Sequence, residues 1–128
     1  MSFLAFMYVA VGGAFGAMCR FAMMSLIGKI NPGEFPFGTF TVNILGSFLM
    51  GFLVAVIATY LPQRAKDLHL LLAVGMLGGF TTFSSFALDV FTMFERGVIA
   101  QGLVYTFGSV VLSVAALMGG MMCIKLFG

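Results

Sequence analysis

The segment Gly75 to Phe86 reads GMLGGFTTFSSF and lies in the middle of the third of four long apolar stretches. A glycine in a helix interior costs about 1 kcal/mol relative to alanine. The Gly78-Gly79 pair, followed at once by two threonines, therefore invites a break in the helix. A broken helix at membrane depth is tolerated only where the loosened backbone meets protein or lines a cavity. The segment thus predicts a third helix that is broken near the midplane of a bilayer.

The composition around this segment is that of a membrane protein. Of the 128 residues, 62% are hydrophobic and 8% are charged, and the mean hydropathy is +1.17. A soluble domain needs more charge to cover its surface, whereas a membrane helix needs roughly 20 apolar residues. We therefore predict an all-α membrane protein in which residues 1–128 form a single domain of four transmembrane helices. The predicted spans are Phe3–Ile27, Phe37–Tyr60, Leu68–Phe94 and Val98–Phe127.

The first stretch is expected to be a helix of the mature protein. It lacks a basic region before the apolar run, and the run is longer than the ~7–15 residues of a signal peptide. Cys19 and Cys123 are expected to be buried free thiols. Helical rise places them at depths about 18 Å apart, whereas a disulfide needs Cα atoms within about 7 Å.

Basic residues are divided almost evenly between the two sides of the membrane. Arg64, Lys66 and Lys125 fall on the side of the termini, and Lys29 and Arg96 fall on the other, with Arg20 nearer to the latter. A clear excess on one side normally fixes orientation. The balance is either noise in a chain with few charges or a sign of dual topology. Because C₂ dimers are the commonest oligomers, we favour an antiparallel homodimer.

The first helix combines small residues with one buried charge. Gly12 and Gly16 lie one turn apart and let another helix approach closely. Arg20 follows one turn later, about 10 Å from the helix end. An unpaired arginine in lipid costs about 2.5–3.5 kcal/mol on insertion scales, so Arg20 is expected to face protein or a water-filled vestibule. A structural role, bonding helix carbonyls, and an anion-attracting role fit equally well.

Polar side chains form one stripe on the second helix and another on the fourth. A single serine or threonine in a membrane helix usually bonds the preceding turn, but four in a row are harder to explain in that way. They indicate either a polar track or a polar seam between helices, and we favour the track. The stripes consist of Thr39, Asn43, Ser47 and Gly51, and of Gln101, Tyr105, Ser109 and Ser113.

The side chains available for a lining favour an anion over a cation. No carboxylate lies at mid-membrane, with the possible exception of Asp89 near the end of the third helix. Phe80, Phe83 and Phe86 recur every third residue; such a stripe alone indicates packing, but phenyl rings also carry positive edges. Carbonyls freed by a helix break could hold a cation. The donors, the ring edges and Arg20 together indicate an anion pathway and do not name the anion.

Three of these segments resemble motifs of the Fluc, or CrcB-type, fluoride channel family. Gly75–Phe86 is similar to its third-helix signature, and Gly12–Arg20 and Asn43–Gly51 to its first- and second-helix motifs. The resemblance covers the whole chain in length, helix number and motif order. Ser85 stands where the family usually has threonine, and Asp89 where glutamate is expected, so Asp89 is left out of the predicted site.

The resemblance implies a fluoride-selective channel that exports the ion passively across a bacterial inner membrane and gives fluoride resistance. It implies an antiparallel homodimer with two pores and a structural sodium ion at its centre, held by the carbonyls of Gly75 and Gly78. The implied partners are fluoride, sodium, membrane lipid and a second copy, without nucleic acid. Arg20 is assigned to a vestibule or a structural role. The implied pore residues are Asn43, Phe80, Thr82, Phe83, Ser84, Tyr105, Ser109 and Ser113.

Three other classes of protein fit the sequence less well. A small multidrug transporter would need a buried carboxylate in the first helix, where this chain has Arg20 instead. A non-transporting assembly subunit would explain the glycines but not two aligned polar stripes. An enzyme is not expected, because His69 lies at a helix end without a serine or cysteine nucleophile and no cluster of metal ligands occurs.

Overall fold

The computed structural model describes all 128 residues, and every regular element in it is helical. Three spans are unbroken α-helices: α1 (Phe3–Ile30), α2 (Phe37–Tyr60) and α6 (Ile99–Phe127). The remaining span runs from Pro62 to Glu95 through several shorter elements. All four are long and apolar enough to cross a membrane, which confirms the predicted number of spans.

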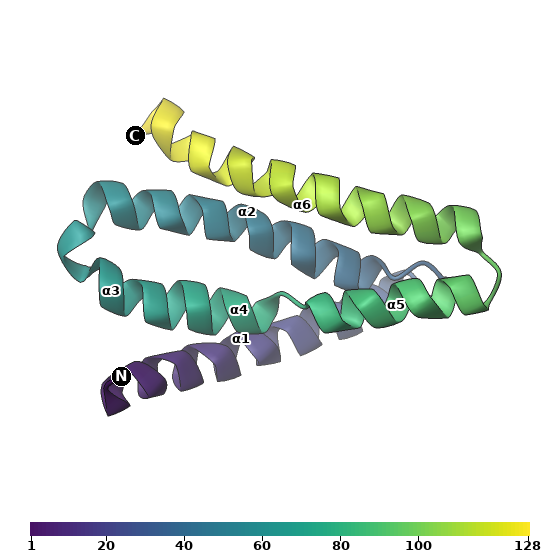
Figure 1. Cartoon of the computed structure of the whole chain (residues 1–128), viewed down its shortest axis with the longest axis horizontal. Helices are drawn as coiled ribbons and strands as arrows, with labels where there is room; N and C mark the ends of the chain where they lie inside the picture. The colour runs from purple at the N-terminus through teal and green to yellow at the C-terminus, as the bar shows by residue number, and fades with distance from the viewer.

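The four spans lie side by side and alternate in direction (Figure 1). Both termini and the connection after α2 lie at one end of the molecule, and the other two connections lie at the opposite end. The third span begins at Pro62 instead of the predicted Leu68, since a proline in the first turn leaves no helical N–H unsatisfied. The turn before α6 contains Gly97 with a φ of 78°, a conformation that favours glycine.

The third span changes its helical geometry along its length. It consists of η1 (Pro62–Arg64), α3 (Ala65–Leu68), the π-helical η2 (His69–Leu77), α4 (Gly78–Phe80) and α5 (Phe83–Glu95). Thr81 and Thr82 between α4 and α5 are extended, with φ, ψ of −83°, 158° and −151°, 113°. The π-helical geometry has no counterpart in the sequence pattern. The placement of Thr81 and Thr82 at the midplane of a bilayer stays a prediction.

Glycines set how closely α1 packs against the third span. A Cβ added at Gly12 would overlap the carbonyl oxygen of Leu71, and one added at Gly16 would overlap that of Met76. A Cβ at Gly75 would lie 3.1 Å from the Cα of Gly12. The two backbones are therefore in direct contact, as the spacing of small residues in the first helix predicted.

The α2 and α6 helices cross with the same closeness. A Cβ at Gly51 would overlap the carbonyl oxygen of Leu117, and one at Gly120 would overlap that of Phe48. This contact fixes the rotation of α6 relative to α2. Asn43 and Ser47 of the α2 stripe and Ser109 and Ser113 of the α6 stripe line one cavity beside the segment between α4 and α5.

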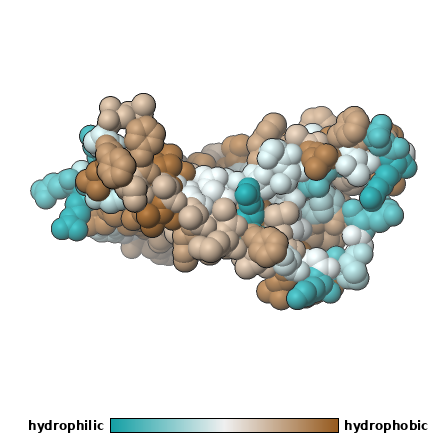
Figure 2. Space-filling model, turned by 90° about the horizontal axis from the view of Figure 1, so that it is seen from below, coloured by the Kyte–Doolittle hydropathy of each residue, from teal (hydrophilic) through white to brown (hydrophobic).

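The surface suits an apolar surrounding. Only 19 of the 128 residues are buried, so the apolar side chains of all four spans face mostly outward. Figure 2 shows hydrophilic atoms gathered at the two ends, with brown and white atoms covering most of the surface between them. Cys19 and Cys123 are free thiols, as predicted, but they are half-buried instead of buried.

Replacing Gly16 by alanine is expected to destabilise the protein, because the added Cβ would overlap the Met76 carbonyl oxygen. Overpacking of this kind costs about 1–3 kcal/mol. Gly28→Ala in the same helix is the matched control, since nothing lies within 4 Å of its added Cβ. It should leave stability unchanged or raise it by about 0.5–1 kcal/mol. Thermal unfolding in detergent measures both changes, and equal melting temperatures would contradict the close crossing.

Candidate functional site

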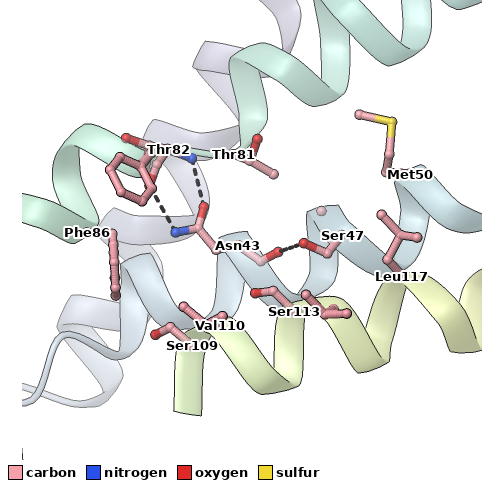
Figure 3. Close-up of a pocket in the computed structure, with 13 residues that line it drawn as sticks. Asn43, Ser47, Met50, Thr81, Thr82, Phe86, Ser109, Val110, Ser113 and Leu117 are labelled. Carbon is pink, nitrogen blue, oxygen red and sulfur yellow. Dashed lines mark hydrogen bonds between the residues drawn. The ribbon is translucent and has the colours of Figure 1, made fainter. Parts of the chain in front are cut away.

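A mainly apolar cavity of about 400 Å³, with several polar side chains in its wall, lies beside the extended Thr81–Thr82 segment. It is bounded by α2, α5 and α6, and Figure 3 shows its labelled side chains converging from these elements. No charged side chain lines it. The lining residues are Asn43, Gly46, Ser47, Met50, Thr81, Thr82, Phe83, Phe86, Ser109, Val110, Ser113, Val114 and Leu117.

Asn43 on α2 holds the extended segment in place. Its Nδ2 donates to the carbonyl oxygen of Thr82 at 2.9 Å, and its Oδ1 accepts from the N–H of Thr82 at 2.7 Å (Figure 3). One amide thus satisfies both backbone groups of a residue that has left the helical ladder. Because a primary amide has two N–H groups, one donor of Asn43 is left over for a second partner.

Both threonines bond to backbone groups of the flanking helices. The Thr81 hydroxyl donates at 3.0 Å to the carbonyl of Leu77, which also accepts the Thr81 N–H at 3.0 Å. The buried Thr82 oxygen accepts from the Ser85 N–H at 3.1 Å and so caps the start of α5. The Ser84 hydroxyl lies 3.3 Å from the Thr82 hydroxyl, but Ser84 does not line the cavity.

Arg20 reaches the same break from α1. Its Nη1 donates to the Thr81 carbonyl oxygen at 3.4 Å, and its side chain is half-buried. Two roles were considered for Arg20, and this hydrogen bond to a carbonyl at a helix end is the contact expected for the structural role. A cationic charge at that end is also favourable, because carbonyl dipoles accumulate there.

The serines of the two stripes meet in this cavity. Ser47 donates to the Asn43 carbonyl at 2.7 Å, the usual bond to the preceding turn. Ser109 on α6 is only 6% exposed, and its hydroxyl is buried without any hydrogen-bond partner. A buried polar group left unpaired costs about 1–3 kcal/mol. Ser113 lies one turn further along α6 and lines the same cavity.

Two phenyl rings complete the lining. Phe83 is 78% exposed and Phe86 is buried, and their ring centroids lie 5.6 Å apart. Phe80 is also buried but does not line the cavity; a Cβ added at Gly46 would meet its ring at 3.1 Å. Of the predicted phenylalanine pair, the structure therefore brings only Phe83 to the cavity.

Tyr105 lies behind Phe86 and not in the cavity wall. Its ring is fully buried, with its centroid 5.3 Å from that of Phe86. Its hydroxyl donates to Asp89 Oδ2 at 3.0 Å. The donor of Tyr105 is therefore taken by Asp89, a residue that the sequence left without a role.

Two residues that line the cavity, Phe86 and Ser47, were not among the predicted pore residues, although the sequence pattern pointed to both. Phe86 shares the three-residue spacing of Phe80 and Phe83, and Ser47 belongs to the stripe of Asn43. The spacing could not tell which two of the three rings face the cavity. That choice depends on the extended backbone at Thr81 and Thr82, which rotates α5 relative to α4.

Known proteins resemble this chain over most of its length. Residues 7–121 match the sequence profile of a family described as CrcB-like protein, Camphor Resistance (CrcB). The chain belongs to the CrcB family. A relative from Paracoccus denitrificans named "Fluoride-specific ion channel FluC" is 50% identical over 116 residues, which cover 91% of this chain and 90% of that protein. Relatives with the same name from Agrobacterium fabrum and Rhizobium leguminosarum bv. trifolii are 43% and 44% identical over 113 residues, in each case 88% of this chain and 90% of the relative.

Family membership confirms the resemblance drawn from the three motifs, and together with four apolar helices it makes this chain a multi-pass membrane protein. The two glycines predicted to bind sodium differ in their surroundings. Gly75 is buried against α1, whereas Gly78 is exposed. The Gly78 N–H donates to the carbonyls of Ala73 and Gly75, so the Gly75 carbonyl already has a hydrogen-bond partner within the same chain.

Replacing Asn43 by alanine is expected to release the Thr82 backbone. Each lost hydrogen bond is worth about 1 kcal/mol, so amide exchange at Thr82 should accelerate about tenfold or more. Asn43→Asp keeps the acceptor for the Thr82 N–H and should accelerate exchange less. Ser47→Ala, which leaves both Asn43 bonds in place, is the control. Hydrogen exchange on peptides covering residues 78–86 measures the difference, and unchanged exchange in Asn43→Ala would contradict the assigned role.

Proposed function

We propose that this protein is a fluoride-specific channel that lets the ion leave the cell passively and so gives fluoride resistance. The observation that carries the proposal is the buried, unpartnered hydroxyl of Ser109 in a cavity without charged side chains. A small anion needs donors to replace its water, and a cation would instead need oxygen acceptors or carboxylates. The name "Fluoride-specific ion channel FluC" carried by relatives up to 50% identical supports fluoride as that anion.

Donors from both helices support passage of a dehydrated anion through the cavity. The spare N–H of Asn43 and the hydroxyls of Ser109 and Ser113 can be given to an anion without breaking a bond within the chain. Phe83 and Phe86 add ring edges, which are positive and approach an anion favourably. Thr82, Ser84 and Tyr105 act in this proposal through the backbone and Asp89 contacts that hold the lining in place.

The cavity supports a channel assembled from two copies. Phe83 is 78% exposed, and the Thr81 carbonyl and the Thr82 backbone lie outside the helical hydrogen-bond ladder. Lipid cannot hydrogen-bond loosened backbone or hydroxyl groups, so a wall of this kind must be covered by protein. A second copy placed antiparallel would bring the breaks of both chains together at the midplane and form two equivalent pores. The even division of basic residues supports that orientation.

A structural sodium ion is proposed at the centre of this dimer. The two-fold axis of an antiparallel pair lies in the plane of the membrane, so carbonyls of Gly75 and Gly78 from both copies could provide four oxygens. The exposure of Gly78 supports a role at such an interface. Because the Gly75 carbonyl also accepts the Gly78 N–H, it would have to use its second lone pair. A density map of the dimer that shows a water at the axis would contradict this part.

The remaining features of the proposal follow from the channel assignment. A channel has no catalytic step, so we assign no enzymatic activity. The membrane is proposed to be the bacterial inner membrane, and residues 1–128 are proposed to act as one domain. No nucleic acid takes part.

Purified protein in liposomes is expected to pass fluoride without a proton or sodium gradient and to exclude chloride. Ser109→Ala should lower fluoride flux about tenfold or more, because a hydrogen bond to a charged group contributes roughly 1.5–3 kcal/mol. Phe83→Ile should also lower flux, since it keeps volume but removes the ring edge. Phe91→Ile, an exposed ring on α5 away from the cavity, is the control. Equal fluoride and chloride fluxes would refute the assignment, and normal flux in Phe83→Ile would return that ring to packing.

Two copies biased to opposite orientations are expected to be active only together. Adding two or three lysines beside Arg64 and Lys66 gives that side a clear excess of positive charge, enough to fix one orientation. Lysines added near Lys29 and Arg96 should fix the other. Each biased copy should export no fluoride alone, and coexpression should restore export. If labelling shows one orientation and that copy alone is fully active, the antiparallel dimer is wrong.

A further inference from the structure

Two apolar grooves flank one lysine at the end of the molecule that carries both termini. The α1 groove, of about 330 Å³, runs along Ala5, Phe6 and Val9. The α2 groove, of about 440 Å³, runs along Val54, Ile57 and Ala58. Lys66 and Leu70 line both grooves, so they form the ridge between them. Neither residue belongs to the cavity near Asn43.

Both grooves run from the level of Lys66 toward the middle of the spans. The α1 groove extends from Ala5 to Val9, and the α2 groove extends from Ala58 to Val54. Each distance is one helical turn, about 6 Å, and both run in the same direction. Leu70 lies one turn beyond Lys66 in that direction too. The two apolar grooves therefore run parallel to each other, beginning at Lys66 and extending toward the apolar middle of the protein.

The charge at the mouth of the grooves is positive. Lys66 and Arg64 are exposed, and the exposed His69, which lines the α2 groove, adds a ring N–H donor. Asp67 is the one acidic residue between 61 and 70, which leaves a net charge of +1 there when His69 is neutral. No carboxylate lines either groove. A ligand with one anionic group and two apolar chains would match this surface.

We propose that the Lys66 ridge binds one anionic phospholipid. The phosphate lies on the Lys66 ammonium, and one acyl chain occupies each groove. Charge complementarity selects the headgroup, and the pair of grooves selects a lipid with two chains over a soluble phosphate. This site rests on the membrane location of the chain and does not depend on which ion the channel carries.

Native mass spectrometry of the detergent-purified protein with added phosphatidylglycerol tests the proposal, with phosphatidylcholine of the same acyl chains as comparison. The wild-type protein should retain phosphatidylglycerol preferentially. Lys66→Gln should weaken that binding about fivefold, the effect of one lysine near an anionic lipid. Lys125→Gln, which removes a charge at the same end outside both grooves, should leave it unchanged.

A second pair of variants tests the grooves while the charge stays in place. Ala58→Phe fills the α2 groove and should weaken binding, whereas Ala100→Phe on an exposed part of α6 should not. Equal retention of the two lipids, unchanged binding in Lys66→Gln, or equal effects of Ala58→Phe and Ala100→Phe would each overturn the site. Competition by soluble glycerol phosphate as strong as that of the lipid would also overturn it, since the grooves would then contribute nothing. Fluoride flux is not part of this measurement, so its outcome is separate from that of the channel assignment.

Discussion

The structure depends on how the backbone of Thr81 and Thr82 is satisfied in an apolar surrounding. Both residues are extended. The Thr81 N–H still donates to the Leu77 carbonyl, but the Thr81 C=O and both backbone groups of Thr82 lack the partners that a continuous helix would provide. In lipid such groups cost several kcal/mol each when unpaired. Asn43 takes both groups of Thr82, and Arg20 reaches the carbonyl of Thr81. Three of the four spans therefore meet at this one interruption.

Close helix crossings make these contacts possible. Gly12 and Gly16 bring α1 against the third span, which places Arg20 one turn later within reach of Thr81. Gly51 and Gly120 do the same for α2 and α6, so Ser109 faces the cavity that Asn43 borders. The small residues thus act indirectly on the chemistry of the site. A larger side chain at any of them would move donors away from the break.

The same interruption supplies both a support and a lining. Asn43 and Thr82 are fully engaged in holding the backbone, except for one N–H of the amide, while Ser109 and Phe83 have no such partners. Of the groups that hold the break, Thr82 is buried and Asn43 is half-buried. Of the two groups without such partners, Ser109 is buried and only Phe83 faces outward and remains to be covered. This division explains why a single chain presents a complete support with an open wall.

The sequence alone determined the number of apolar helices and the segment where the third one is interrupted, because these depend on local properties. Apolar length fixes the spans, and the Gly78-Gly79-Phe80-Thr81-Thr82 run weakens the helix where it stands. Only the tertiary structure decided which side chains face the cavity. The extended angles at Thr81 and Thr82 rotate α5, so Phe86 joins Phe83 while Phe80 packs against Gly46. The engagement of Tyr105 by Asp89 likewise depends on a contact between α6 and α5, which no local pattern encodes.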